Sequence, residues 1–276
     1  MSQSQRTRVM GIVNVTPDSF SDGGKFASPA DGIEHARRLI AHGADILDIG
    51  GESTRPGAAP VSEFDEILRV VPLIEAIGEA SDIPISIDTM KPGVARVAVK
   101  AGATIWNDVS ALRFAPNAPE VAAELGCEVV LMHMLGAPGT MQDDPRYEDV
   151  VAEVEAFLLA RAFTAMAAGV AKEKIWLDPG VGFGKTLAHN LALLGALPRF
   201  VALGYPVLLG ASRKRFIAGI DPSAGEPTDR LGGSLAAHLV GAAAGVAAVR
   251  VHDVRETVQA LEVQAAITAA GGARQG

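Results

Sequence analysis

The chain has 276 residues, of which 49% are hydrophobic and 20% are charged. This length suits a single α/β barrel or two smaller domains, and the composition excludes a disordered chain. A formal net charge of −8 and a pI near 5.3 would repel a phosphate backbone, so we expect no nucleic-acid partner.

The cysteine count and the lengths of the apolar runs favour a cytoplasmic location. Cys127 is the only cysteine, which excludes a disulfide framework and a cysteine-based zinc site and suits a reducing environment. The apolar run at 9–13 is too short for a signal peptide, and the run at 239–249 is too short to span a membrane. We therefore expect a globular, cytoplasmic protein with no membrane partner.

Eight short apolar runs recur along the chain at an average spacing of about 35 residues, and each precedes a segment with helical periodicity. The predicted strands are 9–13, 44–49, 83–87, 103–106, 127–132, 174–177, 206–209 and 246–251.

Two of the intervening segments show the helical pattern well. Ser62, with Asp65 three residues later, forms a capping pair that predicts a helix start. Asp253 is the expected cap of a C-terminal helix in which Val254, Val258 and Leu261 repeat at helical steps. The buried stripe predicted for the first of these helices is Phe64, Ile67, Leu68, Val71 and Ile74.

Alternating strands and helices require parallel strands, because each crossover helix returns the chain to the same end of the sheet. The fold class is therefore α/β, and eight units favour closure into a (β/α)₈ TIM barrel. An open doubly wound sheet is the competing layout, since periodicity does not reveal closure. No linker divides the chain, so we expect residues 1–276 to form a single domain.

Polar residues end nearly every predicted strand, and in a parallel barrel these ends form the active face. One such residue is ordinarily a helix cap, whereas a ring of them at one mouth indicates a binding site. Carboxylates and amides on the middle strands suit a heterocycle with N–H donors, and cations on the last two strands suit an anion. The ring comprises Asn14, Gly50 to Glu52, Asp88, Asn107, Asp108, His133, Asp178, Ser212 to Arg215, Arg250 and His252.

The loops after the first two strands, 16–24 and 52–57, are rich in Gly, Ser and Asp. They are candidates for lids that close over a substrate, and ordinary surface turns are the alternative. Each carries one large or cationic side chain, Phe20 or Arg55.

The sequence has no complete nucleotide-binding or metal-binding motif. The segment 182–186, Gly-Phe-Gly-Lys-Thr, resembles the end of a P-loop, but the first glycine that a P-loop requires is replaced by Pro179. No dinucleotide fingerprint follows the first strand. His133 lacks a second histidine at ligand spacing, so we interpret it as a packed, hydrogen-bonded core residue, as we do the histidines of the helical segments, His238 among them.

Residues 10–24 (MGIVNVTPDSFSDGG) and 48–57 (DIGGESTRPG) resemble the two signature stretches of dihydropteroate synthases. The similarity continues at the later strand ends, through residues 87–89, 107–110, 131–134, 177–186, 210–214 and 250–252. The two signatures together are specific for the family rather than for the fold.

The resemblance implies a (β/α)₈ barrel that joins 6-hydroxymethyl-7,8-dihydropterin diphosphate to 4-aminobenzoate in folate synthesis. It also implies Mg²⁺ as cofactor, a homodimer, and membership of a family that sulfonamides target. The reaction that it implies resembles an S_N1 substitution, in which diphosphate leaves before the arylamine attacks. The amine is already neutral at pH 7, so no strong general base is expected.

The resemblance also assigns residues by motif position. The expected pterin contacts are Asp88, Asn107, Met132, Asp178, Phe183, Lys214 and Arg250. The expected diphosphate contacts are Asn14, which reaches it through Mg²⁺, and Arg55, Arg250 and His252. The expected 4-aminobenzoate contacts are Phe20, Thr54, Arg55, Pro56, Phe183, Ser212, Lys214 and Arg215. The expected catalytic set is Arg55, Asp88, Asp178, Lys214, Arg250 and His252.

One position departs from the family pattern, because many members have Ser where this chain has Arg215. Two other functions remain open. A pterin-binding methyltransferase would share the barrel and the slot, but it does not need Asn14, Arg55 or the pair Arg250 and His252. A catalytically silent paralogue would only bind pterin or a partner.

Overall fold

The computed structural model describes residues 6–15, 29–53, 59–136 and 139–272. Eight strands form one parallel sheet in the order β6-β5-β4-β3-β2-β1-β8-β7. The strands are β1 (Arg8–Asn14), β2 (Ile46–Gly50), β3 (Ile85–Asp88), β4 (Ile105–Asp108), β5 (Glu128–Met132), β6 (Ile175–Asp178), β7 (Leu208–Leu209) and β8 (Ala248–Val251). All eight predicted strands are confirmed, with ends that shift by one or two residues.

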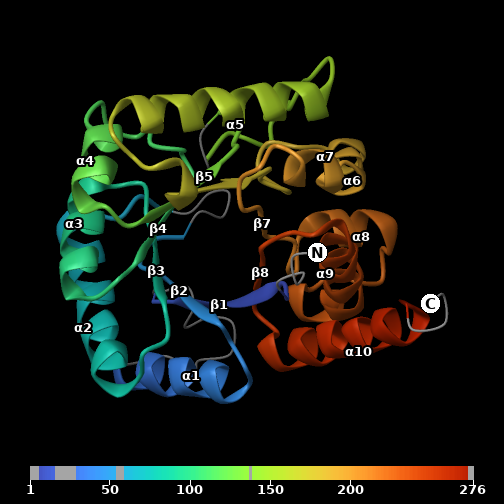
Figure 1. Ribbon diagram of the computed structural model, residues 1–276, viewed down its shortest axis with the longest axis horizontal. Coiled ribbons are helices and arrows are strands. Elements are labelled where there is room, and N and C mark those ends of the chain that lie inside the picture. Colours follow the sequence, from blue (N-terminus) through green and yellow to red (C-terminus); the bar gives the residue numbers. More distant parts are fainter. Residues whose placement is uncertain (1–5, 16–28, 54–58, 137–138, 273–276) are drawn as a thin grey trace.

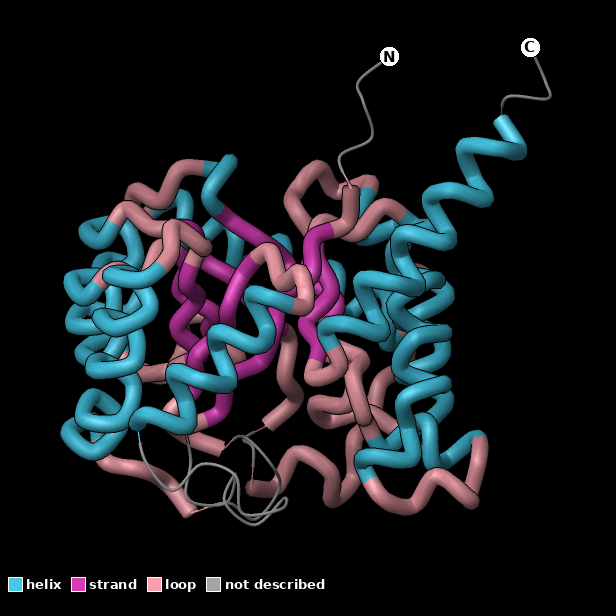
Figure 2. Tube along the Cα trace, turned by 90° about the horizontal axis from the view of Figure 1, so that it is seen from below, coloured by secondary structure: helices cyan, strands magenta, loops and turns pink. Residues whose placement is uncertain are grey.

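The sheet closes on itself. A parallel bridge between Leu177 and Val207 joins β6 to β7, and the Leu177 N–H donates to the Pro206 carbonyl at 2.9 Å. The fold is therefore the predicted (β/α)₈ barrel and not the open doubly wound sheet. Figure 1 shows the helices arranged around the strands, and Figure 2 shows the strands between helices from a second direction.

The helices connect successive strands and cover the outside of the barrel. They are α1 (Pro29–Ala41), α2 (Glu63–Ala80), α3 (Pro92–Ala101), α4 (Ala118–Leu125), α5 (Val150–Ala167), α6 (Leu187–Gly195), α7 (Leu197–Val201), α8 (Arg215–Ile220), α9 (Leu231–Ala244) and α10 (Val254–Gly272). Short 3₁₀ turns occur at η2 (Lys172–Lys174) and η3 (Pro227–Arg230). Among the described residues, every helix is too short or too polar to cross a lipid bilayer.

Helix α2 confirms the predicted cap and corrects the predicted stripe. The Ser62 hydroxyl accepts the Asp65 N–H at 3.1 Å, as the capping pair requires. Phe64 and Leu68, however, are 69% and 56% exposed. Ile74 is buried as predicted, and Ile67 and Val71 are partly buried against the core. The buried residues of the helix are Glu66, Val70, Leu73, Ile74 and Ile77. The stripe was misassigned because a buried carboxylate, which is bonded to Lys91, begins the true inner face.

The inside of the barrel is layered. An apolar floor is formed by Met10, Ile46, Ile105, Val130, Trp176, Leu208 and Ala248, one from each of seven strands. Because side chains alternate along a strand, the residues two positions further on face the same interior. That next layer contains Ile12, Asp48, Asn107, Met132, Asp178, Gly210 and Arg250. A polar layer therefore lies on an apolar floor at the carboxyl ends of the strands.

Candidate active site

Arg250 of β8 lies at the centre of the polar layer. Its Nε donates to Asp48 Oδ2 at 2.5 Å, and its Nη2 donates to Asp88 Oδ2 at 2.7 Å. The Asp48 side chain is fully buried, and the Arg250 side chain is 23% exposed. One guanidinium therefore joins strands β2, β3 and β8 and still reaches the mouth of the barrel.

The electrostatics of this cluster are set by burial and by opposite charges. Burial lowers the pKa of Arg250, but the carboxylates of Asp48 and Asp88 outweigh it and raise the pKa above the ordinary value. Burial raises the pKa of Asp88, the Arg250 charge opposes that rise, and the neighbouring Asp48 adds to it. Arg250 therefore stays positively charged, whereas the protonation state of Asp88 depends on the charges around it.

Asp48 is a site residue that sequence reasoning missed. It lies inside a predicted strand, and its partners Arg250 and Asn107 lie on other strands, so a local pattern does not show its role. The Asn107 Nδ2 lies 3.4 Å from both carboxylate oxygens of Asp48. The Asn107 amide N–H₂ group therefore donates to Asp48, which leaves the Asn107 carbonyl oxygen on the side away from Asp48. The signal that could have found Asp48 is one charged residue in an otherwise apolar strand, two positions after Ile46.

Asp178, at the end of β6, and Lys214, in the turn after β7, are a second set of opposite charges that act on each other. The Asp178 Oδ1 accepts the Gly180 N–H at 2.7 Å, and the Lys214 Nζ donates to the Val181 carbonyl. A methyl group on Gly210 would lie 3.6 Å from Lys214 Nζ and 3.9 Å from Asp178 Oδ2. Gly210, which has no side chain, thus lies next to both groups.

Burial acts in opposite directions on the two members of this pair. It raises the pKa of Asp178, against the charge of Lys214 and the Gly180 N–H. It lowers the pKa of Lys214 to about 8, against the charge of Asp178. Each group thus depends on the other to stay charged, which suits a slot that presents a carboxylate and an ammonium to one ligand.

The apolar side of the slot is formed by Met132 and Phe183, which pack in one cluster with Val109, Met134 and Met141. The Lys214 Nζ lies 4.7 Å from the centre of the Phe183 ring. The structure thus brings together four of the seven predicted pterin contacts, Met132, Asp178, Phe183 and Lys214, at the ends of β5, β6 and β7.

Ser212 and His252 meet at the ends of β7 and β8. The Ser212 Oγ lies 2.9 Å from the His252 Nδ1 and accepts the His252 backbone N–H at 3.1 Å. Between Ser212 and Lys214, Arg213 has a left-handed backbone with φ 56°. Its guanidinium donates to both oxygens of Asp253, directly before α10. This tether holds the turn in which Ser212 and Lys214 lie.

Asn14 and Asp88 lie on either side of Gly50. A methyl group on Gly50 would lie 3.6 Å from Asn14 Oδ1 and 3.7 Å from Asp88 Oδ2. Two hard oxygen donors thus border a space that a Cβ would fill, which is the chemistry that Mg²⁺ prefers. Among the described residues there is no group of three or more His, Cys, Asp or Glu side chains that could hold a metal ion. Asp88 Oδ2 also accepts from Arg250 Nη2 at 2.7 Å, so Asn14 Oδ1 is the oxygen free to hold Mg²⁺, and such an ion would take its other ligands mainly from substrate and water.

The remaining predicted contacts fall outside this arrangement. Phe20, Thr54, Arg55 and Pro56 lie outside the described residues. Arg215 begins α8 with an exposed side chain, next to the slot residue Lys214 but directed to solvent. His133 is buried and hydrogen-bonded, as predicted.

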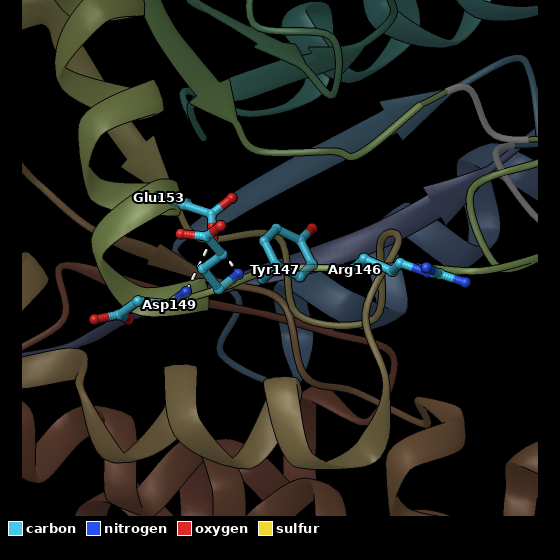
Figure 3. A pocket seen from close by; sticks show the side chains of 5 residues that line it. Arg146, Tyr147, Asp149 and Glu153 are labelled. Carbon is cyan, nitrogen blue, oxygen red and sulfur yellow. Dashed lines mark hydrogen bonds between the residues drawn. The ribbon is translucent and has the colours of Figure 1, made fainter.

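A surface hollow of about 450 Å³ lies at the start of α5, lined by residues 146–149 and Glu153 (Figure 3). The Glu153 Oε1 accepts the backbone N–H groups of Glu148 and Asp149 at 2.8 and 3.0 Å, and Asp149 accepts two further N–H groups of the first turn. These carboxylates serve the start of the helix.

Charged side chains gathered at the carboxyl-end mouth of a parallel (β/α)₈ barrel define a barrel enzyme with its active site at that mouth. The sequence model of the family "Pterin binding enzyme" matches residues 10–252. The dihydropteroate synthase of Escherichia coli K12 is 51% identical over 92% of this chain and 89% of its own length.

Two solved structures agree. The Xanthomonas albilineans dihydropteroate synthase with 4-aminobenzoic acid is 52% identical, with a TM-score of 0.90 over 96% of this chain and 94% of that one. The same enzyme in complex with 7,8-dihydropteroate has a TM-score of 0.87 at 48% identity, over 97% and 95% of the two chains. This chain belongs to the pterin-binding enzymes and, within them, to the dihydropteroate synthase family.

Proposed function

We propose that this chain joins 6-hydroxymethyl-7,8-dihydropterin diphosphate to 4-aminobenzoate and releases 7,8-dihydropteroate and diphosphate. The observation that carries the proposal is the meeting, at one barrel mouth, of the Asp178 and Lys214 slot with the Arg250 and His252 pair. The first pair suits the amino-pterin edge, and the second suits the diphosphate.

The pterin is proposed to lie in the slot beside Gly210. Asp178 accepts N–H groups of the pterin edge, and Lys214 donates to its ring oxygen. The Asn107 carbonyl, which points away from Asp48, accepts a further ring N–H group. Asp88 and Arg250 border the ring on the central side, and Met132 and Phe183 supply apolar surface to its faces.

Diphosphate is proposed to lie beyond the slot, against Arg250 and His252, with Arg55 of the second loop as a third contact. Asn14, with Asp88 across Gly50, would hold Mg²⁺. When bound, that ion would offset negative charge on the diphosphate. Arg250 is suited to this position because its charge persists whatever the state of Asp88.

The chemistry proposed for the mouth is substitution at the pterin methylene carbon. The carbon–oxygen bond to diphosphate breaks first, and the electron pair leaves with the oxygen. The arylamine nitrogen then forms the new carbon–nitrogen bond and loses one proton to water. Arg250 and His252 stabilise the charge that develops on the leaving group, and Asp88 and Asp178 stabilise the cationic pterin.

The 4-aminobenzoate is proposed to enter over the slot, between Phe183 and the turn 212–214. Ser212, Lys214 and Arg215 face its carboxylate side, with Phe20, Thr54 and Pro56 from the first two loops. We further propose the homodimer that the family resemblance implies, and a cytoplasmic location, which the single reduced thiol of Cys127 favours.

The test is release of diphosphate from pterin diphosphate in the presence and absence of 4-aminobenzoate. We expect release together with formation of 7,8-dihydropteroate, and loss of both in Asp178→Asn. Asp45→Asn is the matched control, because Asp45 bonds Arg6 and the Val9 N–H at the opposite end of β2. Pterin binding without turnover would indicate the silent paralogue, and methyl transfer to a corrinoid protein would indicate the methyltransferase.

A further inference from the structure

Lys185 is a buried cation that no step of the proposed function uses. Its Nζ donates to His133 Nδ1 at 3.0 Å, to the Phe183 carbonyl at 2.9 Å and to the His133 carbonyl at 3.4 Å. The residue is 3% exposed. All three donors of the ammonium are therefore used, and every acceptor belongs to the loop after β5 or the loop after β6.

The acceptor state of His133 is fixed by its surroundings. Burial, with the Lys185 charge next to it, lowers the pKa of His133 to about 3. The neutral ring packs edge-on against Phe157, with centroids 4.8 Å apart. His133 therefore accepts from Lys185 throughout the physiological pH range and cannot rotate freely.

The two loops that Lys185 joins are in direct contact. Gly180 and Gly184 have left-handed backbones, with φ of 68° and 64°. A Cβ on Gly180 would lie 1.9 Å from the His133 carbonyl oxygen, and one on Gly184 would lie 2.8 Å from the Leu135 Cβ. This close approach leaves little room for either loop to move without the other.

Other side chains fix the remaining peptide groups of the β6 loop. The Gly182 N–H donates to Asn190 Oδ1 at 2.7 Å, and the Gly182 carbonyl accepts from Gln142 Nε2 at 2.5 Å. The Gly184 carbonyl accepts from the Tyr147 hydroxyl at 2.8 Å. Lys185 holds the one peptide carbonyl left between them, that of Phe183, whose ring forms one wall of the slot.

Lys185 also acts on the slot by charge. The pKa of Asp178, which burial raises, is lowered by Lys214, the Gly180 N–H, Lys185 and Arg250. No carboxylate is hydrogen-bonded to Lys185 among the described residues, and burial lowers its pKa to about 7, against the charge of Asp178. Two further cations act on these groups: Lys214 lowers the pKa of Lys185, and Arg113 lowers the pKa of His133.

We propose that Lys185 is a positioning residue for the pterin slot: it joins the His133 and Phe183 loops and places a positive charge behind Asp178. This inference rests on the proposed function. It assigns a role to the Gly-Phe-Gly-Lys-Thr segment, which resembles a P-loop but holds a loop instead of a phosphate.

The test is Lys185→Met, which keeps the length of the side chain and removes its donors and charge. We expect the dissociation constant of 6-hydroxymethylpterin, measured by calorimetry, to rise about tenfold or more. Lys174→Met is the matched control, because Lys174 also donates to a backbone carbonyl, that of Gly126, at the other end of β6. We expect wild-type affinity in the control.

A pH profile separates this role from simple loss of packing. Pterin binding requires ionised Asp178, so it weakens as the pH falls through the pKa of that carboxyl. Without the Lys185 charge the pKa of Asp178 rises further, and in Lys185→Met this weakening should begin at a higher pH than in the wild type. A folded Lys185→Met protein with unchanged affinity or an unchanged acid limb would overturn the proposal.

If Lys185→Met does not fold, His133→Phe tests the same contact from the β5 side. It keeps a ring against Phe157 and removes only the Nδ1 acceptor. We expect pterin affinity to fall several-fold, and unchanged affinity would overturn the proposal. Diphosphate release by the wild-type enzyme is scored separately, so failure of the proposed function is distinguishable from failure of this inference.

Discussion

The Nε of Arg250 lies 2.5 Å from the Oδ2 of Asp48, a fully buried carboxylate in the strand on the other side of β1. This contact aligns the guanidinium that we assign to the diphosphate, and the same carboxylate orients the Asn107 amide. One buried carboxylate thus positions two side chains to which we assign substrate contacts.

Asp48→Asn should therefore weaken pterin binding although Asp48 is not a ligand. The new amide N–H₂ group faces the donors of Arg250 and Asn107, and a buried mismatch of this kind costs roughly 1 to 3 kcal/mol. We expect about a tenfold rise in the dissociation constant of 6-hydroxymethylpterin by calorimetry. Asp45→Asn, with its ion pair at the other rim, should bind normally. Equal affinity in both variants would remove Asp48 from the site.

Asp178→Asn tests the slot itself. The substitution keeps the shape but turns one acceptor oxygen into a donor that faces a pterin N–H group, again at a cost of roughly 1 to 3 kcal/mol or more. Pterin affinity should fall by tenfold or greater. Unchanged affinity of a pterin ligand in the calorimeter would show that the pterin edge lies elsewhere.

Arg250→Ala should discriminate between ligands with and without diphosphate. Because the guanidinium is a persistent cation at the mouth, its loss should weaken binding of pterin diphosphate more than binding of the corresponding alcohol. The two dissociation constants, measured on the same preparation, provide the ratio. Equal losses would mean that Arg250 only lies against the ring.

Arg215→Ser should have a small effect. The Arg215 side chain is exposed, and an exposed charge pair contributes about 0 to 1 kcal/mol. We expect the KM for 4-aminobenzoate to rise by no more than about fivefold, with kcat nearly unchanged, and added salt to remove much of the difference. A hundredfold loss in kcat would contradict a role at the carboxylate.

His238 of α9 makes stability depend on pH. It is buried, neither ring nitrogen has a hydrogen-bond partner among the described residues, and burial lowers its pKa to about 4. The unfolded chain takes up this proton near pH 6.5 and the folded chain only near 4, so this residue costs stability as the pH falls between these values, by roughly 3 kcal/mol in full.

His238→Leu should remove that part of the acid dependence and leave stability at pH 7 equal or higher, as measured by urea unfolding across this pH range. Replacement of the exposed His42 by Leu is the control. A wild-type pH slope in His238→Leu would contradict the assignment.

The strands and the ring of polar residues could be predicted because both follow from patterns among residues close together in the sequence. Apolar runs set the strands, and chain direction sets which ends meet. The inner face of α2 could not be predicted, because Glu66 is buried only by virtue of Lys91, a residue that lies on another element. The roles of Asp48 and Lys185 could not be predicted for the same reason, because their partners lie on other strands and loops. His238 is packed in the core as predicted, but the interpretation that it is hydrogen-bonded was wrong, since neither ring nitrogen has a hydrogen-bond partner among the described residues.

The bridge between Leu177 and Val207 joins β6 to β7. Because β7 has only two strand residues, this junction is the weakest seam between strands of the barrel. Asp178 and Lys214 lie on opposite sides of that seam. A ligand that bonds both therefore acts as a cross-brace over the part of the wall with the least backbone support, and the free energy of binding becomes resistance to opening of the barrel at that place.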